Sequence, residues 1–210
     1  MTFYFVRHGE STWNVERRFQ GQLDPPLSDL GILQAQSLAR RLAQESRPAA
    51  IVSSPLQRAR RTAEIIGERC HVPVSLDRRL VEICHGPWQG ELETDVARRW
   101  PALYRQWHEM PDLARFPEGE SLSDVEVRFL SFIGDALAMP SPLLICTHDV
   151  LVRLAVLWAR HEPLGRFSEW RTENAGITEI EIQHGTRRVS RYNDIEHLDG
   201  LRSDVARQAL

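Results

Sequence analysis

The residues with the clearest chemical potential follow directly after a short apolar run near the start of the chain. Phe3 to Val6 is typical of a buried strand, and the polar run Arg7-His8-Gly9-Glu10 comes next. Open α/β sheets bind their ligands at the carboxyl ends of their strands. We therefore expect Arg7 and His8 to lie at a ligand-binding edge, with Gly9 allowing the backbone to turn sharply after the histidine.

The segment after Gly9 indicates that the ligand is an anion. Ser11 can cap a short helix through Asn14, and the amide donors at such a helix start would face an anion such as phosphate. A single histidine after a strand is more often a turn residue than a catalytic one, so this hypothesis needs support from elsewhere in the chain.

Two later segments repeat the same geometry. Residues 51–54 form an apolar strand pattern, Ser54-Pro55 is typical of a helix start, and Arg58 then falls in the first helical turn. Residues 143–147 form another strand pattern, which ends at His148 and is followed by apolar residues at helical spacing. Because all three junctions are expected at one sheet edge, two histidines and two arginines converge there.

A set of short motifs extends this pattern over nearly the whole chain. It comprises Arg7-His8-Gly9-Glu10 with Asn14, Gly21-x-x-Asp24 with Pro26-Leu27-Ser28 and Gly31, Ser53-Ser54-Pro55-Leu56 with Arg58, Ala59 and Thr62, Leu80-x-Glu82-Ile83-x-x-Gly86-x-Trp88-x-Gly90, Gly119-Glu120-Ser121-Leu122, Thr147-His148, and Asn193-Asp194 with His197-Leu198. Through these motifs the chain resembles the histidine phosphatase superfamily, also called the phosphoglycerate mutase-like family. The resemblance implies a metal-independent phosphomonoester hydrolase that acts on a small phosphorylated metabolite through a phosphohistidine, without a cofactor.

The chemistry of phosphate esters explains why these residue types are needed. A phosphate ester resists attack because its oxygens are negative, so a catalyst needs fixed positive charge and an uncharged nucleophile. Neutral imidazole meets the second need, and by resemblance His8 attacks phosphorus. Arg7, Arg58 and His148 would bind the equatorial oxygens and stabilise the charge of the transition state.

Glu82 matches the family's acid, which protonates the departing alkoxide and later activates water. Its carboxyl would have to be protonated for the first step. Asn14 is expected to add a neutral donor to the substrate. Glu10 is expected to be structural, because a carboxylate so near phosphate is better held away than used as a base. His85, close to Glu82, either contacts substrate or packs.

The chain departs from the family at Asp149, where the usual continuation after the histidine is two glycines. An uncompensated carboxylate about 4 Å from phosphate would cost about 4 kcal/mol at an effective dielectric near 20. Asp149 must therefore point away, cap its helix or meet a cation. Since aspartate is favourable at a helix start, we expect capping, and contact with a substrate hydroxyl or amine is the alternative.

The remaining pattern predicts a single domain over residues 1–210, folded as a three-layer α/β/α sandwich around a mostly parallel mixed sheet. At 210 residues the chain can bury about 70% of its unfolded surface around one core. Further strands are expected near 72–76, 177–182 and 188–192, with helices that open at Ser28-Asp29 and span 55–69.

Residues 91 to about 127 interrupt this alternation and form a predicted helical insert over the active site. Trp100 and Leu103 recur at helical spacing and are best explained as the insert's own core. In the resembled family the insert shapes substrate choice. Tyr104, Trp107 and Phe116 are therefore candidate substrate-binding residues.

Composition limits the partners and the location. Lys and Arg total 26 against 29 Asp and Glu, which gives no reason to expect nucleic acid or an anionic membrane as a partner. No signal segment is evident, since strand residues follow Met1 almost at once, and no membrane span is evident, since Arg153 interrupts the long apolar stretch after Asp149. The cysteines, which are Cys70, Cys84 and Cys146, form no C-x-x-C pair and fit a reducing, cytoplasmic compartment.

Several alternatives stay open at this point. A phosphoglycerate mutase resembles the same motifs but typically carries a longer insert and a closing tail, so the short insert favours hydrolysis. A phosphate-binding regulator without turnover is a second rival, although the retained catalytic set counts against it. The acidic and histidine residues of 194–199 follow no recognised ligand spacing, so no metal is expected. The oligomeric state is undetermined, with a homodimer as one option.

Overall fold

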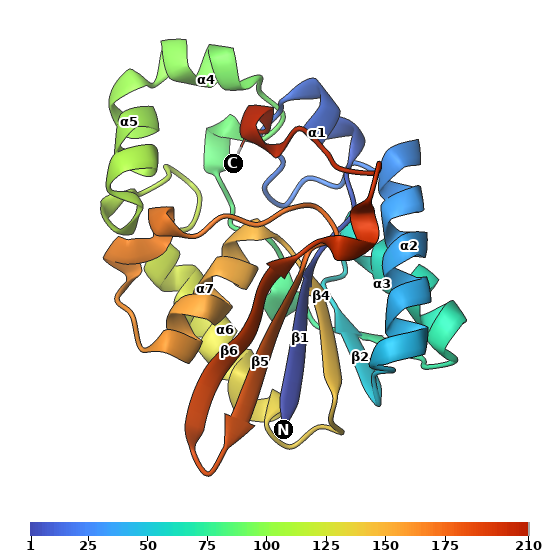
Figure 1. The fold of residues 1–210 in the computed structure, drawn as a ribbon. Coiled ribbons are helices and arrows are strands. Elements are labelled where there is room, and N and C mark those ends of the chain that lie inside the picture. The colour runs from blue at the N-terminus through green and yellow to red at the C-terminus, as the bar shows by residue number, and fades with distance from the viewer. Residues whose placement is uncertain (210) are drawn as a thin grey trace.

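The computed structural model describes residues 1–209 and centres on a six-stranded mixed sheet (Figure 1). The strands lie in the order β3-β2-β4-β1-β5-β6, and their bounds are β1 Thr2–Arg7, β2 Ala50–Ser53, β3 Val74–Leu76, β4 Leu143–Thr147, β5 Ile177–Gln183 and β6 Thr186–Asp194. The pairs β1–β4, β4–β2 and β2–β3 are parallel, whereas β5 and β6 run antiparallel to their neighbours. The carboxyl ends of β1, β2 and β4 therefore share one edge of the sheet.

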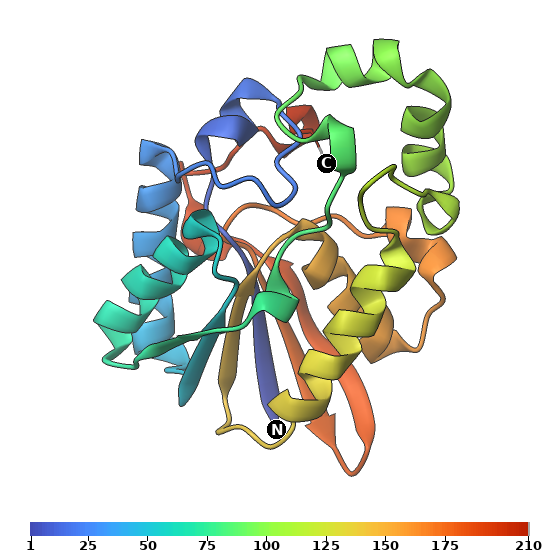
Figure 2. The same cartoon turned by 180° about the vertical axis from the view of Figure 1, so that it is seen from behind.

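Helices cover both faces of this sheet (Figures 1 and 2). One apolar cluster packs α2 (Asp29–Glu45) and α3 (Gln57–Cys70) against the sheet, and the other packs α6 (Leu122–Ala136) and α7 (Asp149–Arg160) against the opposite face. Strand β1 divides its side chains between them, since Phe3 and Phe5 belong to one cluster and Tyr4 and Val6 to the other. The predicted three-layer sandwich is confirmed.

The remaining helices gather at the carboxyl edge of the sheet. Short helix α1 (Thr12–Glu16) follows β1, and α4 (Glu93–Arg99) and α5 (Pro101–Glu109) form most of the insert (Figure 1). Helix α6 already begins at Leu122, so the last residues of the predicted 91–127 segment belong to a core helix. The insert lies above the edge where β1, β2 and β4 end (Figure 2).

Local capping explains where two of these helices start. The Ser11 hydroxyl accepts from the Asn14 backbone while the Asn14 side chain accepts from the Ser11 backbone, which confirms the predicted cap of α1. Ser28 caps α2 through the backbone amide of Gly31. Helix α3 differs from expectation: it begins at Gln57 after Leu56, and Ser54 makes only a 3.3 Å contact with the Leu56 amide.

The chain end returns to the same edge. After β6 the backbone passes through short helical turns at Glu196–Leu198 and Val205–Arg207 and ends near α1 (Figures 1 and 2). No helix within residues 1–209 is long and apolar enough to span a bilayer.

Candidate active site

The carboxyl edge of the sheet holds a small, partly enclosed pocket. Its lining combines residues from β1, α3, α7, the loop before Trp88 and the C-terminal tail: Arg7, His8, Gln20, Gly21, Arg58, Glu82, His85, Trp107, Asp149, Val150 and Ala209. The structure therefore brings His8, Arg7, Arg58 and Glu82 together as predicted. His148 lies beside them, with its ring centre 5.2 Å from that of His8.

His8 is held as a neutral imidazole with one nitrogen available for attack. Its Nδ1 lies 2.7 Å from the carbonyl oxygen of Gly9, so Nδ1 carries the proton and donates it there. Nε2 then keeps a lone pair, and the Arg58 Nε donates to it at 3.3 Å. Burial, and then the charges of Arg58 and Arg7, hold the pKa of His8 well below its ordinary value. A neutral nucleophile is what phosphorus attack requires.

Arg58 is fixed by the loop that precedes α2. Its two terminal nitrogens donate to the carbonyl oxygens of Leu23, at 2.8 Å, and Gly21, at 2.7 Å. Burial lowers the pKa of Arg58 to about 10, so the guanidinium stays charged at neutral pH. Because its position in α3 is rigid and its head is doubly bonded, this charge is preorganised for an anion.

Arg7 supplies the second fixed cation. One terminal nitrogen donates to the carbonyl oxygen of Thr172 at 2.7 Å, and the other donates to the Gln208 side-chain oxygen at 2.6 Å. Its side chain is 1% exposed, and its Nε has no hydrogen-bond partner within the described residues. Arg7 therefore retains donor capacity inside the pocket.

His148 is oriented by Ser54, whose hydroxyl lies 2.8 Å from the histidine Nε2. This contact accounts for the shifted start of α3, because the Ser54 hydroxyl serves the site and does not act as the N-cap. Nδ1 of His148 is buried without a partner among residues 1–209. Burial and the charge of Arg58 lower the pKa of His148, so it too is neutral before an anion binds.

Glu82 is positioned as an acid that can hold a proton near neutral pH. One carboxyl oxygen accepts from the backbone amide of Ile83 at 2.9 Å, and the Glu82 carbonyl accepts from Gln22 and Arg128. Burial, and then the negative charge of Asp149, raise the pKa of Glu82 to about 7. The protonation that the sequence required of this residue is therefore available.

Asp149 corrects the capping prediction. Helix α7 is preceded by His148, which makes no side-chain cap, and Asp149 is the first residue inside the helix. Its carboxylate pairs with Arg153 one turn later at 2.7 Å, lies 3.9 Å from Arg7, and accepts from the Thr172 hydroxyl at 2.6 Å. Arg153, Arg7 and the Thr172 hydroxyl therefore compensate the charge of this buried carboxylate. Without such partners, its burial would be costly in free energy.

Glu10 lies outside the reaction space, as expected for a structural residue. Its carboxylate accepts from the Ser28 hydroxyl at 2.8 Å, and its backbone amide donates to Gln34. The donor is thus the hydroxyl that also caps α2.

The aromatic residues of the insert occupy different positions. Trp107 lines the pocket, but Phe116 packs behind it in the core, with ring centres 5.2 Å apart. Tyr104 donates to Glu93 at 2.8 Å and is not part of the pocket wall. Of the three residues predicted from the insert, Trp107 alone borders the reaction space in this conformation.

His85 is both packed and exposed to the pocket. It stacks among Phe19, Trp88 and Phe116, lines the pocket, and keeps both ring nitrogens without partners within residues 1–209. Burial lowers the pKa of His85 to about 3, so the ring is neutral. His85 therefore packs in the core and also lies where a substrate could contact it, so the two roles left open by the sequence are compatible.

The C-terminal tail was not anticipated from the sequence. The Gln208 side-chain oxygen accepts from Arg7 at 2.6 Å and from the Asn14 side-chain amide at 3.0 Å, while the Gln208 amide donates to Asn174. Ala209 closes the pocket, which keeps only about 20 Å³ of free space. No spacing or periodicity near residue 208 could have signalled this contact.

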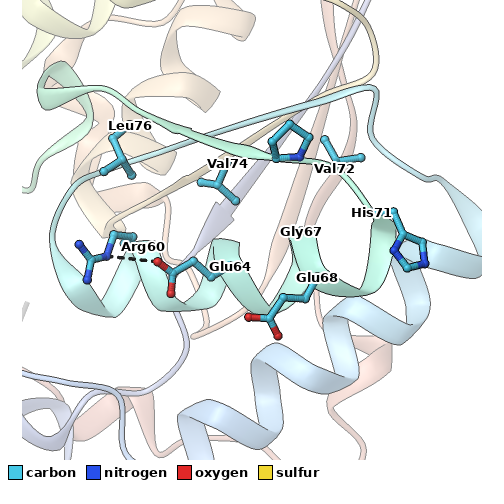
Figure 3. Close-up of a pocket in the computed structure, with 9 residues that line it drawn as sticks. Arg60, Glu64, Gly67, Glu68, His71, Val72, Val74 and Leu76 are labelled. Carbon is cyan, nitrogen blue, oxygen red and sulfur yellow. Dashed lines mark ion pairs between the residues drawn. The ribbon is translucent and has the colours of Figure 1, made fainter.

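A wider depression lies away from this edge, between α3 and β3 (Figure 3). It is open to solvent and measures about 490 Å³. Its charged groups already pair with each other, as Arg60 does with Glu64 at 3.4 Å. Since it presents no convergent, buried polar groups, we place the chemistry at the smaller pocket.

Comparison with known proteins agrees with this geometry. Residues 3–195 match the model of the histidine phosphatase superfamily, branch 1. The chain belongs to the histidine phosphatase superfamily. It is 34% identical over 195 residues to phosphoserine phosphatase 1 of Hydrogenobacter thermophilus, covering 92% of each chain. It is also 34% identical to a probable phosphoglycerate mutase, GpmB, of Escherichia fergusonii, covering 93% of this chain and 94% of the relative.

The solved structure of YhfR from Bacillus stearothermophilus superposes with a TM-score of 0.88 at 33% identity, covering 94% of this chain and 98% of the other. Family membership and the phosphatase relative identify this histidine phosphatase as an enzyme of phosphomonoester chemistry.

Proposed function

We propose that this histidine phosphatase hydrolyses a small phosphomonoester in two steps, without a metal ion, with His8 as the nucleophile. The observation that carries the proposal is the pairing of opposite pKa shifts in one pocket. His8 is kept neutral by burial and by Arg58, whereas Glu82 is kept protonated to about pH 7. One group can therefore attack while the other donates a proton.

In the first step the Nε2 lone pair of His8 forms a bond to phosphorus as the ester P–O bond breaks. The departing oxygen takes the proton of Glu82, so it leaves as an alcohol. In the second step a water attacks phosphorus and gives a proton to the Glu82 carboxylate, and the P–N bond breaks to release inorganic phosphate. His8 and Glu82 return to their starting states.

Arg7, Arg58 and His148 are proposed to surround the phosphoryl oxygens during both steps. The two guanidinium groups are fixed by backbone carbonyls, so little reorganisation is needed as charge develops. Asn14 directs its amide toward the same space, since it already donates to the Gln208 oxygen there. These fixed donors supply the electrostatic stabilisation that a bound metal provides in other phosphatases.

Product analysis separates hydrolysis from phosphoryl transfer. The insert length does not separate them, because the probable mutase relative matches over 94% of its own length. We expect 3-phosphoglycerate to give inorganic phosphate and glycerate, with or without 2,3-bisphosphoglycerate. Accumulation of 2-phosphoglycerate would establish a mutase, and absence of turnover on any phosphomonoester would establish a binding protein.

The cellular location is proposed to be the cytoplasm. Cys70, Cys84 and Cys146 are all free in the structure, and two of them are buried. Unpaired thiols are typical of proteins in a reducing compartment.

A further inference from the structure

A second cavity lies directly beside the catalytic pocket. It measures about 180 Å³ and is lined by Glu93, Trp107, His108, Arg153, Phe167, Ser168, Arg171, Val205, Ala206 and Gln208. Trp107 lines both spaces, and Gln208 reaches from this cavity to Arg7 through its 2.6 Å hydrogen bond. The C-terminal tail thus borders both spaces, with Ala209 at the catalytic pocket and Gln208 at this cavity.

The arginines of the two spaces are close to each other. Asp149 stands between them, with one oxygen 3.9 Å from Arg7 and the other 2.7 Å from Arg153. The Asp149 carboxylate alone therefore lies between a group bound at Arg153 and the Arg7 guanidinium, which is proposed to bind the phosphoryl group. This separation suits two groups on the same small molecule.

Arg153 has donor capacity beyond its ion pair with Asp149. Its side chain is 11% exposed, it stacks on Phe167 at 4.9 Å, and its Nε is buried without a hydrogen-bond partner within the described residues. A buried donor without a partner costs free energy that a ligand oxygen would recover.

The two arginines of the cavity differ in their partners. Arg153 already pairs with Asp149, whereas Arg171 forms no ion pair among the described side chains. The lining carboxylate, Glu93, accepts a hydrogen bond from Tyr104. His108 adds no charge near neutral pH, because burial and the two arginines lower its pKa although Glu93 raises it. Arg171 and the unpartnered Nε of Arg153 are therefore the donors that this cavity offers to an anionic group.

We propose that this cavity is the leaving-group subsite and that it binds a carboxylate carried by the substrate, using Arg153 and Arg171. The inference rests on the proposed hydrolysis, and it names the class of substrate as phosphorylated carboxylic acids. Planar carboxylate oxygens match the fork of donors on a guanidinium. A second phosphate fits less well, because its double charge would meet Asp149 and Glu93 beside the same arginines.

Arg171 provides the clean test, since Arg153 also holds Asp149. The Arg171 side chain is exposed, and the contacts of this residue with Tyr192 use backbone atoms, so Arg171→Ala leaves them in place. Arg105→Ala is the matched control, because Arg105 is an exposed arginine of the insert that does not line the cavity.

The substrates are pairs that differ in the carboxylate: phosphoserine with phosphoethanolamine, and 3-phosphoglycerate with glycerol 3-phosphate. We expect the wild type to prefer the carboxylated member of each pair. Arg171→Ala should lower kcat/KM for that member by about tenfold or more, the scale of one lost charged hydrogen bond, while sparing its partner. Arg171→Lys should keep part of the preference, since it keeps the charge but loses the planar fork.

Equal losses on both members of a pair, or no difference between Arg171→Ala and Arg105→Ala, would overturn the subsite. Failure of the proposed hydrolysis itself would give a different result: the wild type would then leave 4-nitrophenyl phosphate and all four metabolites uncleaved.

Discussion

At the scale of single residues, burial acts in opposite directions on the pKa values of two kinds of side chain in the pocket. Loss of water penalises the charged form, so it lowers the pKa of the His8 imidazole and raises that of the Glu82 carboxyl to about 7. Both groups are therefore uncharged together near neutral pH. An uncharged nucleophile and a protonated acid are what the first step of ester cleavage needs.

The first prediction concerns the covalent intermediate. Brief mixing with labelled substrate, followed by trapping under conditions that preserve P–N bonds, should place acid-labile phosphate on His8. His8→Ala should remove all label, because Nε2 of His8 is the available lone pair. Peptide mapping checks the position, and label on a serine or an aspartate would exclude this mechanism.

The second prediction concerns leaving-group protonation. Since the pKa of Glu82 is about 7, the rate of the first step for alkyl phosphates should fall as pH rises above 7, where the carboxyl loses its proton. Glu82→Gln should slow such esters by roughly 10² or more, and an activated aryl phosphate less. Single-turnover rates on both substrates measure this. Equal losses would show that Glu82 only supports the fold or binds phosphate.

The third prediction concerns Asp149. Its negative charge raises the pKa of Glu82, second only to burial, so Asp149→Asn should lower that pKa. The alkaline limb of the pH profile for an alkyl phosphate should then move to lower pH. Asp194→Asn serves as the control, because Asp194 pairs with Arg41 outside the pocket. An unmoved limb would mean that Asp149 does not act on the acid.

At the scale of elements, three strand-to-helix junctions supply the polar side chains of the pocket, and the insert supplies part of its wall. The junctions after β1, β2 and β4 present His8, Arg58 and His148 from a rigid sheet, which keeps their separations small. The insert contributes a wall through Trp107 and a core through Phe116.

The fourth prediction follows from that division. Phe116→Ala should destabilise the fold by about 3 to 5 kcal/mol, the usual range for a buried phenylalanine, and lower kcat/KM for all substrates alike. Trp107→Phe keeps much of the core volume but reshapes the pocket wall, so it should change the ranking of substrates. Thermal unfolding and relative kcat/KM separate the two, and an unchanged ranking in Trp107→Phe would remove it from the substrate site.

At the scale of the whole molecule, the two ends of the chain meet in one pocket. Arg7 is the last residue of β1 and Gln208 follows the turn Val205–Arg207, yet a terminal nitrogen of Arg7 lies 2.6 Å from the Gln208 side-chain oxygen. The Gln208 oxygen accepts from Arg7 and Asn14, the donors proposed to bind the phosphoryl oxygens. We therefore expect substrate to compete with Gln208 for these donors.

The fifth prediction tests that competition. Gln208→Ala should lower the KM of a small aryl phosphate about fivefold, since the substrate no longer displaces hydrogen bonds with a net value of about 1 kcal/mol. kcat should change little. The exposed Gln36→Ala on α2 is the control. A raised KM in Gln208→Ala would instead mean that Gln208 helps to hold the substrate.

What the sequence alone determined about this protein is what short-range patterns encode. Strand periodicity, caps such as Ser11 and the rule that parallel strands share an edge were enough to bring His8, Arg58 and His148 together, and the resembled motif placed Glu82 in the same site. These predictions depend on the positions of strands and helix starts along the chain, and local sequence governs those positions.

Tertiary structure decided where side chains point and what lies far along the chain. Asp149 occupies a helix start, where capping was the expected role, but Arg153, Arg7 and Thr172 compensate its charge within the fold. Gln208 reaches Arg7 across 201 residues of sequence, a contact that no local pattern encodes. The pKa of Glu82 likewise depends on burial and on Asp149, and both exist only once the chain has folded.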